Sequence, residues 1–182
     1  MNTIQINKDS TTHVKHFQGV YPIDLLQSAL IKPSIIVINL DNHYMPGSHW
    51  VAVCISDCGY AKYFDSYGLL PYQFEVMAFL LRHSISWTFK SNKLHGFISN
   101  VCGHYCCIYA LHRAMGQSMT SIVNIFVPGR YTSKDKKAVH MFRAYIHEYI
   151  HAYIHTYIHN YIHIYIHTFT HPIQPENVQC NC

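Results

Sequence analysis

The sequence predicts an α+β fold, because segments with strand patterns and segments with helix patterns both occur in the first 143 residues. Residues 34–40 form a β-branched run that is apolar on both faces, which is typical of a buried strand. Residues 47–55 and 60–68 are predicted to be two further strands, joined by turn residues at 57–59. An amphipathic pattern over 73–83 and an apolar, helix-favouring run from Cys102 predict helices.

The remaining segments complete this prediction. Residues 1–14 are polar and are expected to be a flexible N-terminus, 17–26 a turn followed by a short helix, and 86–89 a strand. The helix from Cys102 is expected to stop at Gly116, Ser118 to cap a helix through Phe126, and Ser133 to cap a last helix over about 134–143. For the helix over 73–83 the expected buried face is Phe74, Met77, Leu80 and Leu81.

Length and composition suit one domain followed by a tail. The chain has 182 residues, and we assign 15–143 to the domain and 144–182 to the tail. The net charge of +4 with 12% charged residues predicts weak attraction to DNA at most and identifies no partner. The longest apolar runs fall far short of the roughly 20 residues of a membrane span. We therefore expect a soluble protein, and a monomer.

The cysteines indicate a reducing compartment. There are seven of them, an odd number that includes the adjacent pair Cys106 and Cys107, and the first residues show no signal-peptide pattern. We expect free thiols and an intracellular location, in the nucleus or the cytoplasm.

The tail is a low-complexity repeat. Tyr-Ile-His recurs with a period of four from residue 145 to residue 167. A simple-sequence extension of low order explains this best. The alternative is a metal-binding helix face, since histidines at i and i+4 can chelate a divalent ion, but we assign no metal site to the chain.

Cys102 stands where a polar loop becomes a helix, in Asn-Val-Cys-Gly-His-Tyr-Cys-Cys. Unpaired N–H groups and the positive end of the dipole at a helix N-terminus stabilise a thiolate over a thiol. Gly103 leaves the backbone beside the sulfur open to a substrate carbonyl. The sequence therefore marks Cys102 as a candidate nucleophile.

Two polar residues upstream supply its candidate partners. His49 belongs to Gly-Ser-His-Trp-Val-Ala and Asp65 to Tyr-Phe-Asp-Ser-Tyr-Gly, at the ends of the two strands that the hairpin joins. A thiolate nucleophile needs a base within hydrogen-bond reach, and that base needs a third group to orient it. Neighbouring strands would place His49 beside Asp65, facing the helix that carries Cys102.

These three motifs, in this order, resemble the adenovirus-type cysteine endopeptidases (adenain) of the Ulp1-related superfamily, and in particular the protease of Maverick/Polinton mobile elements. The resemblance covers about residues 12–143 and includes Phe-Gln-Gly-Val-Tyr-Pro at 17–22. It implies a papain-like α+β fold, with a small mixed sheet and a central helix that starts at the nucleophile. By resemblance, Cys102 is the nucleophile, His49 the general base, Asp65 its orienting acid, and Trp50 the aromatic residue that follows the histidine.

The resemblance also implies partners. The substrate would be a protein, and a peptide or DNA could act as an activator, although the sequence itself calls for no cofactor. The basic residues Lys134, Lys136 and Lys137 are the candidates for a weak DNA contact.

One departure from the family concerns the oxyanion site. The family has a glutamine a few residues before the nucleophile, whereas residues 94–101 contain none and His95 stands in its place. A histidine N–H can donate a hydrogen bond, as can the backbone N–H of Cys102. Loss of one such donor costs about 10²–10³ in kcat, so reduced activity is expected.

Two other functions stay open at this point. The first is removal of a ubiquitin-like modifier by the same chemistry. The second is an inactive remnant that persists as a binding module. Cys106 and Cys107 lie one turn further into the apolar run and are expected to be packed thiols.

Overall fold

The structure is a computed structural model that describes residues 14–96, 99–148 and 151. The described residues fall into two units divided between Arg143 and Ala144. The first unit holds every strand and helix discussed below. In the second unit, residues 144–148 and 151 are helical. The expectations for residues 1–13 and for most of the repeat tail, including its order, lie outside the described residues.

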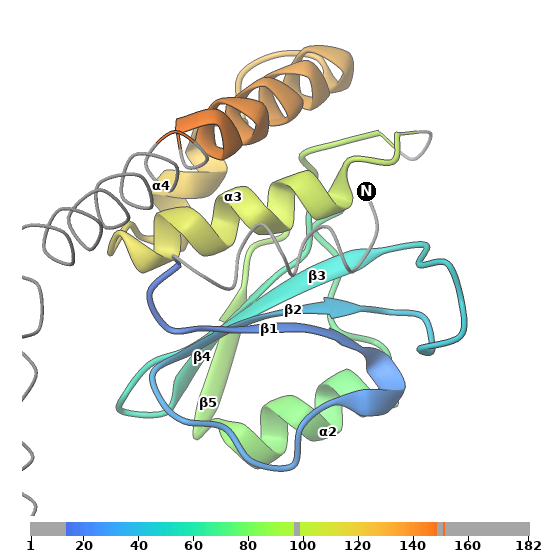
Figure 1. Ribbon diagram of the computed structural model, residues 1–182, viewed down its shortest axis with the longest axis vertical. Coiled ribbons are helices and arrows are strands. Elements are labelled where there is room, and N and C mark those ends of the chain that lie inside the picture. Colours follow the sequence, from blue (N-terminus) through green and yellow to red (C-terminus); the bar gives the residue numbers. More distant parts are fainter. Residues whose placement is uncertain (1–13, 97–98, 149–150, 152–182) are drawn as a thin grey trace, which may run out of the picture. The chain divides into compact units, whose positions relative to one another are not determined.

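A five-stranded mixed sheet forms the centre of the first unit (Figure 1), with strand order β1-β2-β3-β4-β5. Strand β3 (Trp50–Ile55) is antiparallel to both of its neighbours, β2 (Ser34–Asn39) and β4 (Tyr60–Phe64). Strands β1 (Phe17–Pro22) and β5 (Ser86–Phe89) pair in parallel at the two edges. The predicted α+β class with a small mixed sheet is confirmed.

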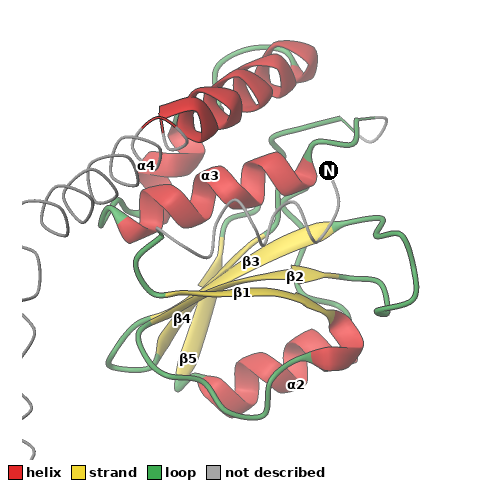
Figure 2. Ribbon diagram, viewed as in Figure 1, coloured by secondary structure: helices red, strands yellow, loops and turns green. Residues whose placement is uncertain are grey.

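Helices cover both faces of this sheet (Figure 2). The 3-10 helix η1 (Ile23–Leu25) and helix α2 (Phe74–His83) lie on one face. Helix α3 (Cys102–Ala114) packs on the other face against β2 and β3, and contacts α4 (Met119–Asn124). Residues 131–143 form a further helix of this unit. Because both faces are covered, β2 and β3 are buried throughout, which explains their continuous apolar runs.

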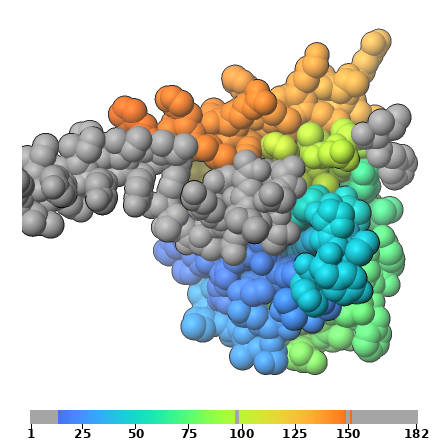
Figure 3. All heavy atoms as spheres, turned by 45° about the vertical axis from the view of Figure 1, so that its right-hand side comes forward, coloured from blue at the N-terminus to red at the C-terminus, as the bar shows by residue number. Residues whose placement is uncertain are grey.

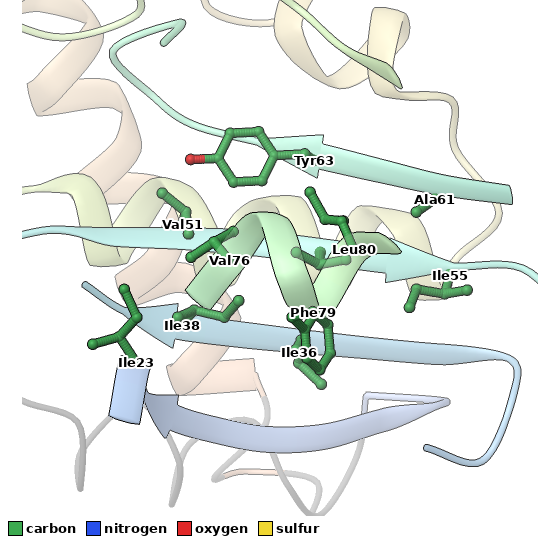
Figure 4. Close-up of a cluster of buried hydrophobic side chains, with 11 residues drawn as sticks. Ile23, Ile36, Ile38, Val51, Ile55, Ala61, Tyr63, Val76, Phe79 and Leu80 are labelled. Carbon is green, nitrogen blue, oxygen red and sulfur yellow. The ribbon is translucent and has the colours of Figure 1, made fainter. Parts of the chain in front are cut away.

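Side chains that alternate along the strands point to opposite faces of the sheet, one covered by α2 and the other by α3. Figure 4 shows the α2 side, where Val76, Phe79 and Leu80 point at side chains of the central strands. On the α3 side, the rings of Phe64 and Tyr109 stack at 4.5 Å. The sheet side chains of the α2 layer are Ile36, Ile38, Val51, Val53, Ile55, Ala61 and Tyr63.

Three local predictions are corrected by the structure. Residues 17–22 form a strand rather than a turn, because pairing with β2 fixes them there; Pro22 is tolerated because β1 is an edge strand. Phe74 and Leu81 are 81% and 69% exposed, whereas Leu80 is buried as predicted. Helix α2 also buries Val76, Phe79 and His83. The last helix begins at residue 131, so Ser133 does not cap it.

Other predictions are confirmed. The turn at 57–59 joins β3 to β4, with the Gly59 N–H donating to the Ser56 carbonyl at 2.9 Å. Ser118 caps α4 by accepting from the backbone N–H of Ser121. Helix α3 ends at Ala114, with Gly116 in the left-handed region. In the described part of the chain the five cysteines are free thiols.

The turn after β4 depends on a glycine. Gly68 has φ +72°, and a Cβ there would lie 2.6 Å from the backbone oxygen of Ser91. Gly116 has a similar φ of +82° with open space around its Cβ position. We expect Gly116→Ala to lower the free energy of unfolding by about 1–2 kcal/mol through backbone strain alone, and Gly68→Ala to lower it further. Urea unfolding of both variants measures the difference. Equal losses would contradict a steric role for the Ser91 contact.

Candidate active site

The ends of three elements meet at one side of the first unit. His49 immediately precedes β3, Asp65 immediately follows β4, and Cys102 is the first residue of α3. Since β3 and β4 are antiparallel, the start of one lies beside the end of the other. The start of β3 and the start of α3 lie on the right-hand side of Figure 1. Both predicted strands are shorter than expected, so His49 and Asp65 stand in the loops that flank them.

His49 and Asp65 are directly paired. Nε2 of His49 lies 2.9 Å from Oδ1 of Asp65, and these side chains are 14% and 2% exposed. Hydrogen bonds at both of its ends close the loop that leads to His49. The backbone N–H of Leu40 donates to the carbonyl of His49 at 2.9 Å, and the Ser48 hydroxyl donates to Asp41 at 3.0 Å. The loop therefore holds the imidazole in position before any substrate binds.

Cys102 interacts with the same imidazole. Burial lowers the pKa of His49, but hydrogen bonding and charge from Asp65 and from Cys102 outweigh burial and raise this pKa to about 9. His49 is therefore an imidazolium at pH 7. Its Nδ1 is buried and, among the described residues, has no hydrogen-bond partner of good geometry. The approach of Cys102 is thus looser than that of Asp65, as is common in enzymes without substrate.

Tyr67 is a part of this site that the sequence analysis missed. Its backbone N–H donates to Oδ1 of Asp65 at 2.7 Å, and its ring lies 4.6 Å from the imidazole of His49. The signal was present in the sequence, since an aspartate two residues before an N–H inside a turn typically accepts from it. Tyr67 therefore fixes both members of the His49–Asp65 pair.

His95 lies behind this arrangement rather than open to it. It is fully buried, and its ring lies 4.1 Å from Tyr67, 5.5 Å from Tyr105 and 6.5 Å from His49. The Ser99 hydroxyl donates to the Gly96 carbonyl at 3.1 Å, and on this network Nδ1 of His95 is assigned as the donor in its 2.9 Å contact with Ser99.

The protonation of His95 bears on the oxyanion prediction. Burial lowers the pKa of His95 to about 4, so the ring is neutral at pH 7 and carries its lone pair on Nε2. Nε2 is buried and without a hydrogen-bond partner in the described residues. An acceptor at this position disfavours His95 as an oxyanion donor.

Trp50 and Gly103 are both buried. Trp50 is 6% exposed, and the thiol of Cys106 donates to its carbonyl at 3.2 Å. Trp50 therefore presents little surface to a substrate. Gly103 lies in the first turn of α3, directly after Cys102, which is itself 2% exposed. Cys102 therefore presents little surface to a substrate.

The described residues hold neither a group of metal ligands nor a membrane-spanning helix. In the ranges given for the structure, no three histidine, cysteine or acidic side chains converge as metal ligands. The same ranges contain no helix with the length and apolarity needed to cross a bilayer. The histidine repeat considered as a metal ligand lies mostly outside them.

Buried histidines make the fold sensitive to acid. The pKa values of His95 and His104 are lowered to about 4, in both cases chiefly by burial. An unfolded histidine titrates near 6.5, so the unfolded chain binds protons first as the pH falls, and stability decreases between about pH 6.5 and 4. We expect urea midpoints to fall between pH 7 and 4.5, and to fall less in His95→Gln. An equal fall in that variant would contradict the assignment for His95.

The raised pKa of His49 makes the stability of the fold depend on pH in a different, alkaline range. Its stabilisation is complete below pH 6.5 and is lost as the pH rises through 9.

Comparisons with known proteins give a weak structural likeness. No family model matches the chain, and no curated protein matches its sequence. Among solved structures, the ASFV pS273R protease is similar over 65% of this chain, with 24% identity and a TM-score of 0.43. The chain spans 46% of the length of that protease. The central domain of the uncharacterized Lpg1148 protein from Legionella pneumophila is similar over 80% of this chain and 97% of its own length, with 16% identity and a TM-score of 0.48.

Proposed function

We propose that this chain is a cysteine endopeptidase with the papain-like arrangement of a helix that begins at the nucleophile. The observation that carries the proposal is the environment of His49. This histidine is paired with Asp65 at 2.9 Å and interacts with Cys102, and its pKa is raised to about 9. A protonated imidazole between a carboxylate and a thiolate is the arrangement that thiol-dependent acyl transfer requires.

Cys102 and His49 have separate roles in the proposed peptide hydrolysis. The Cys102 thiolate attacks the peptide carbonyl carbon, and a C–S bond forms as the carbonyl oxygen becomes an oxyanion. His49 then gives its Nδ1 proton to the leaving amine as the C–N bond breaks, which leaves a thioester on Cys102. His49, now neutral, takes a proton from water, whose oxygen attacks the thioester and releases the acid. The backbone N–H of Cys102, at the first helical position, has no intrahelical acceptor and is available to the oxyanion.

The proposed substrates are structural or packaging proteins of a virus-like or mobile element, by the resemblance given above. A DNA or peptide activator and weak DNA binding stay predictions. The alternative within the same chemistry is cleavage after a ubiquitin-like modifier. Cleavage of a capsid-type polyprotein but not of a ubiquitin-like fusion would select the endopeptidase, and the reverse result would select the isopeptidase.

Two observations favour a second candidate, a binding module without turnover. Cys102 is 2% exposed, and His95 presents an acceptor where the family has a glutamine donor. Such a protein would keep the fold and the His49–Asp65 pair but would not react with thiol reagents at Cys102.

The rate of iodoacetamide labelling as a function of pH separates these candidates. We expect Cys102 to be alkylated at neutral pH. In His49→Ala the rate at neutral pH should fall, because the imidazolium that stabilises the thiolate is gone. The exposed Cys58 provides an internal control whose labelling should not change. An unreactive Cys102 in a folded protein would select the binding module.

A further inference from the structure

A pocket of about 360 Å³ adjoins the residue that precedes the candidate nucleophile. It lies between the start of α3 and the helix formed by residues 131–143, all within the first unit. Figure 3 shows the chain near residue 100, in yellow-green, beside this helix in orange. The pocket is lined by Val101, Asp135, Lys136, Val139, His140 and Arg143. We call it the Val101 pocket.

Side-chain contacts fix the two walls of the pocket relative to each other. The Tyr105 hydroxyl on α3 donates to Oδ1 of Asp135 at 3.1 Å. About two helical turns further along, the ring of Phe142 packs edge-on against His104 at 4.9 Å. Both contacts join the first turn of α3 to the 131–143 helix. The pocket therefore keeps a fixed position beside Cys102.

The lining combines positive charge with apolar surface. Lys136 and Arg143 are the basic residues of the lining, and Asp135 carries the only carboxylate among the six lining residues. That carboxylate already accepts the hydroxyl of Tyr105. Val101 and Val139 add apolar walls. A ligand that fits has a short hydrocarbon stem and an anionic head, which describes a glutamate side chain.

We propose that the Val101 pocket is a substrate subsite that binds an acidic side chain, preferably glutamate, close to the scissile bond. This inference rests on the proposed endopeptidase function. A substrate whose carbonyl reaches the Cys102 sulfur passes within one residue of Val101, so a neighbouring side chain can enter the pocket. The stem packs on the two valines and the carboxylate pairs with Lys136 and Arg143.

The distribution of the basic residues favours a small anionic group over a nucleic-acid strand. Lys134 is 9% exposed and lies over the ring of Tyr131 at 5.1 Å. Lys137 donates to the carbonyl of Ile125 at 2.8 Å. Of the three lysines of this run, only Lys136 lines the pocket among the described residues. The run is therefore divided among separate contacts and does not form one strip along which a phosphate backbone could lie.

The test is a library of fluorogenic peptides in which each position near the scissile bond carries Glu, Gln or Lys in turn. We expect one position at which Glu is cleaved about tenfold faster than Gln, in kcat/KM, as two partly exposed charge pairs would give. The advantage should disappear in the double variant Lys136→Ala/Arg143→Ala, with cleavage of the Gln peptide retained. Arg143→Glu should favour Lys at that position. Arg82→Ala, on α2 at the opposite face of the sheet, is the matched control.

The outcomes are distinguishable. Turnover without a preference for Glu, or a preference that survives in the double variant, overturns the subsite and leaves the endopeptidase standing. No turnover of any peptide, with Cys102 unreactive, overturns the proposed function and the subsite together. Activation by a short DNA duplex that is lost in the double variant, without any preference for Glu, would identify the pocket as a nucleic-acid contact and overturn the substrate assignment.

Discussion

Replacement of Cys102 by alanine is expected to lower kcat for peptide hydrolysis by a factor on the order of 10⁶, judged from loss of the nucleophile in a serine protease. The reason is chemical, since without the sulfur no thioester can form and His49 has no thiol with which to share its proton. The measurement is single-turnover hydrolysis of a peptide that the parent cleaves. Residual activity within tenfold of the parent would assign the nucleophile to another residue.

Cys106→Ala is the matched control for this prediction. Cys106 lies one turn further along α3, is fully buried, and donates its thiol to the carbonyl of Trp50 at 3.2 Å. Burial raises the pKa of its thiol well above the ordinary value, so it is a neutral, packed group. Its loss should cost about 1–2 kcal/mol of unfolding free energy, through a small cavity and an unpaired carbonyl. Activity per folded molecule should stay at the parent level.

The order of the motifs was enough to predict the pairing of His49 with Asp65. The turn chemistry at 57–59 predicted a hairpin, and a hairpin necessarily brings the start of one strand beside the end of the next. The structure shows the two side chains 2.9 Å apart. Their catalytic roles, and that of Cys102, stay predictions, because geometry without a measured reaction does not test them.

Where the local sequence pattern was ambiguous, tertiary packing determined the buried face or the secondary structure of the segment. Helix α2 carries apolar side chains around most of its circumference, so the buried face could not be derived from spacing, and Phe74 proved to be exposed. Residues 17–22 contain a glycine and a proline, which locally favour a turn, yet they form β1 because β2 supplies pairing partners. Such long-range pairing has no local signature.

The chemical state of His95 and the Val101 pocket also required the structure. The tautomer of His95 follows from the hydrogen bond that Ser99 makes to Gly96, which no residue pattern indicates. The pocket joins Val101 to Lys136 and Arg143, which are far away in the sequence and meet through the packing of a helix on the start of α3. A run of lysines indicated only a basic surface.

Asp65→Asn is expected to lower kcat by a factor on the order of 10⁴, as the corresponding change does in a serine protease, and to move the alkaline limit of activity to lower pH. In the parent, kcat/KM should fall as the pH rises through about 9, because His49 then loses the proton that the leaving amine needs. Asp65 raises the pKa of His49 by hydrogen bonding and by charge, and burial acts against it. A neutral amide removes the charge, so the pKa of His49 falls.

The measurement for Asp65→Asn is kcat/KM from pH 5 to pH 10, with Asp57→Asn in the exposed turn between β3 and β4 as the matched control. The control should keep both the rate and the alkaline limit near pH 9. If Asp65→Asn kept the limit near pH 9 while losing rate, Asp65 would orient His49 without setting its charge. If neither changed, the 2.9 Å contact between His49 and Asp65 would be structural, and Asp65 would have no role in orienting or charging His49.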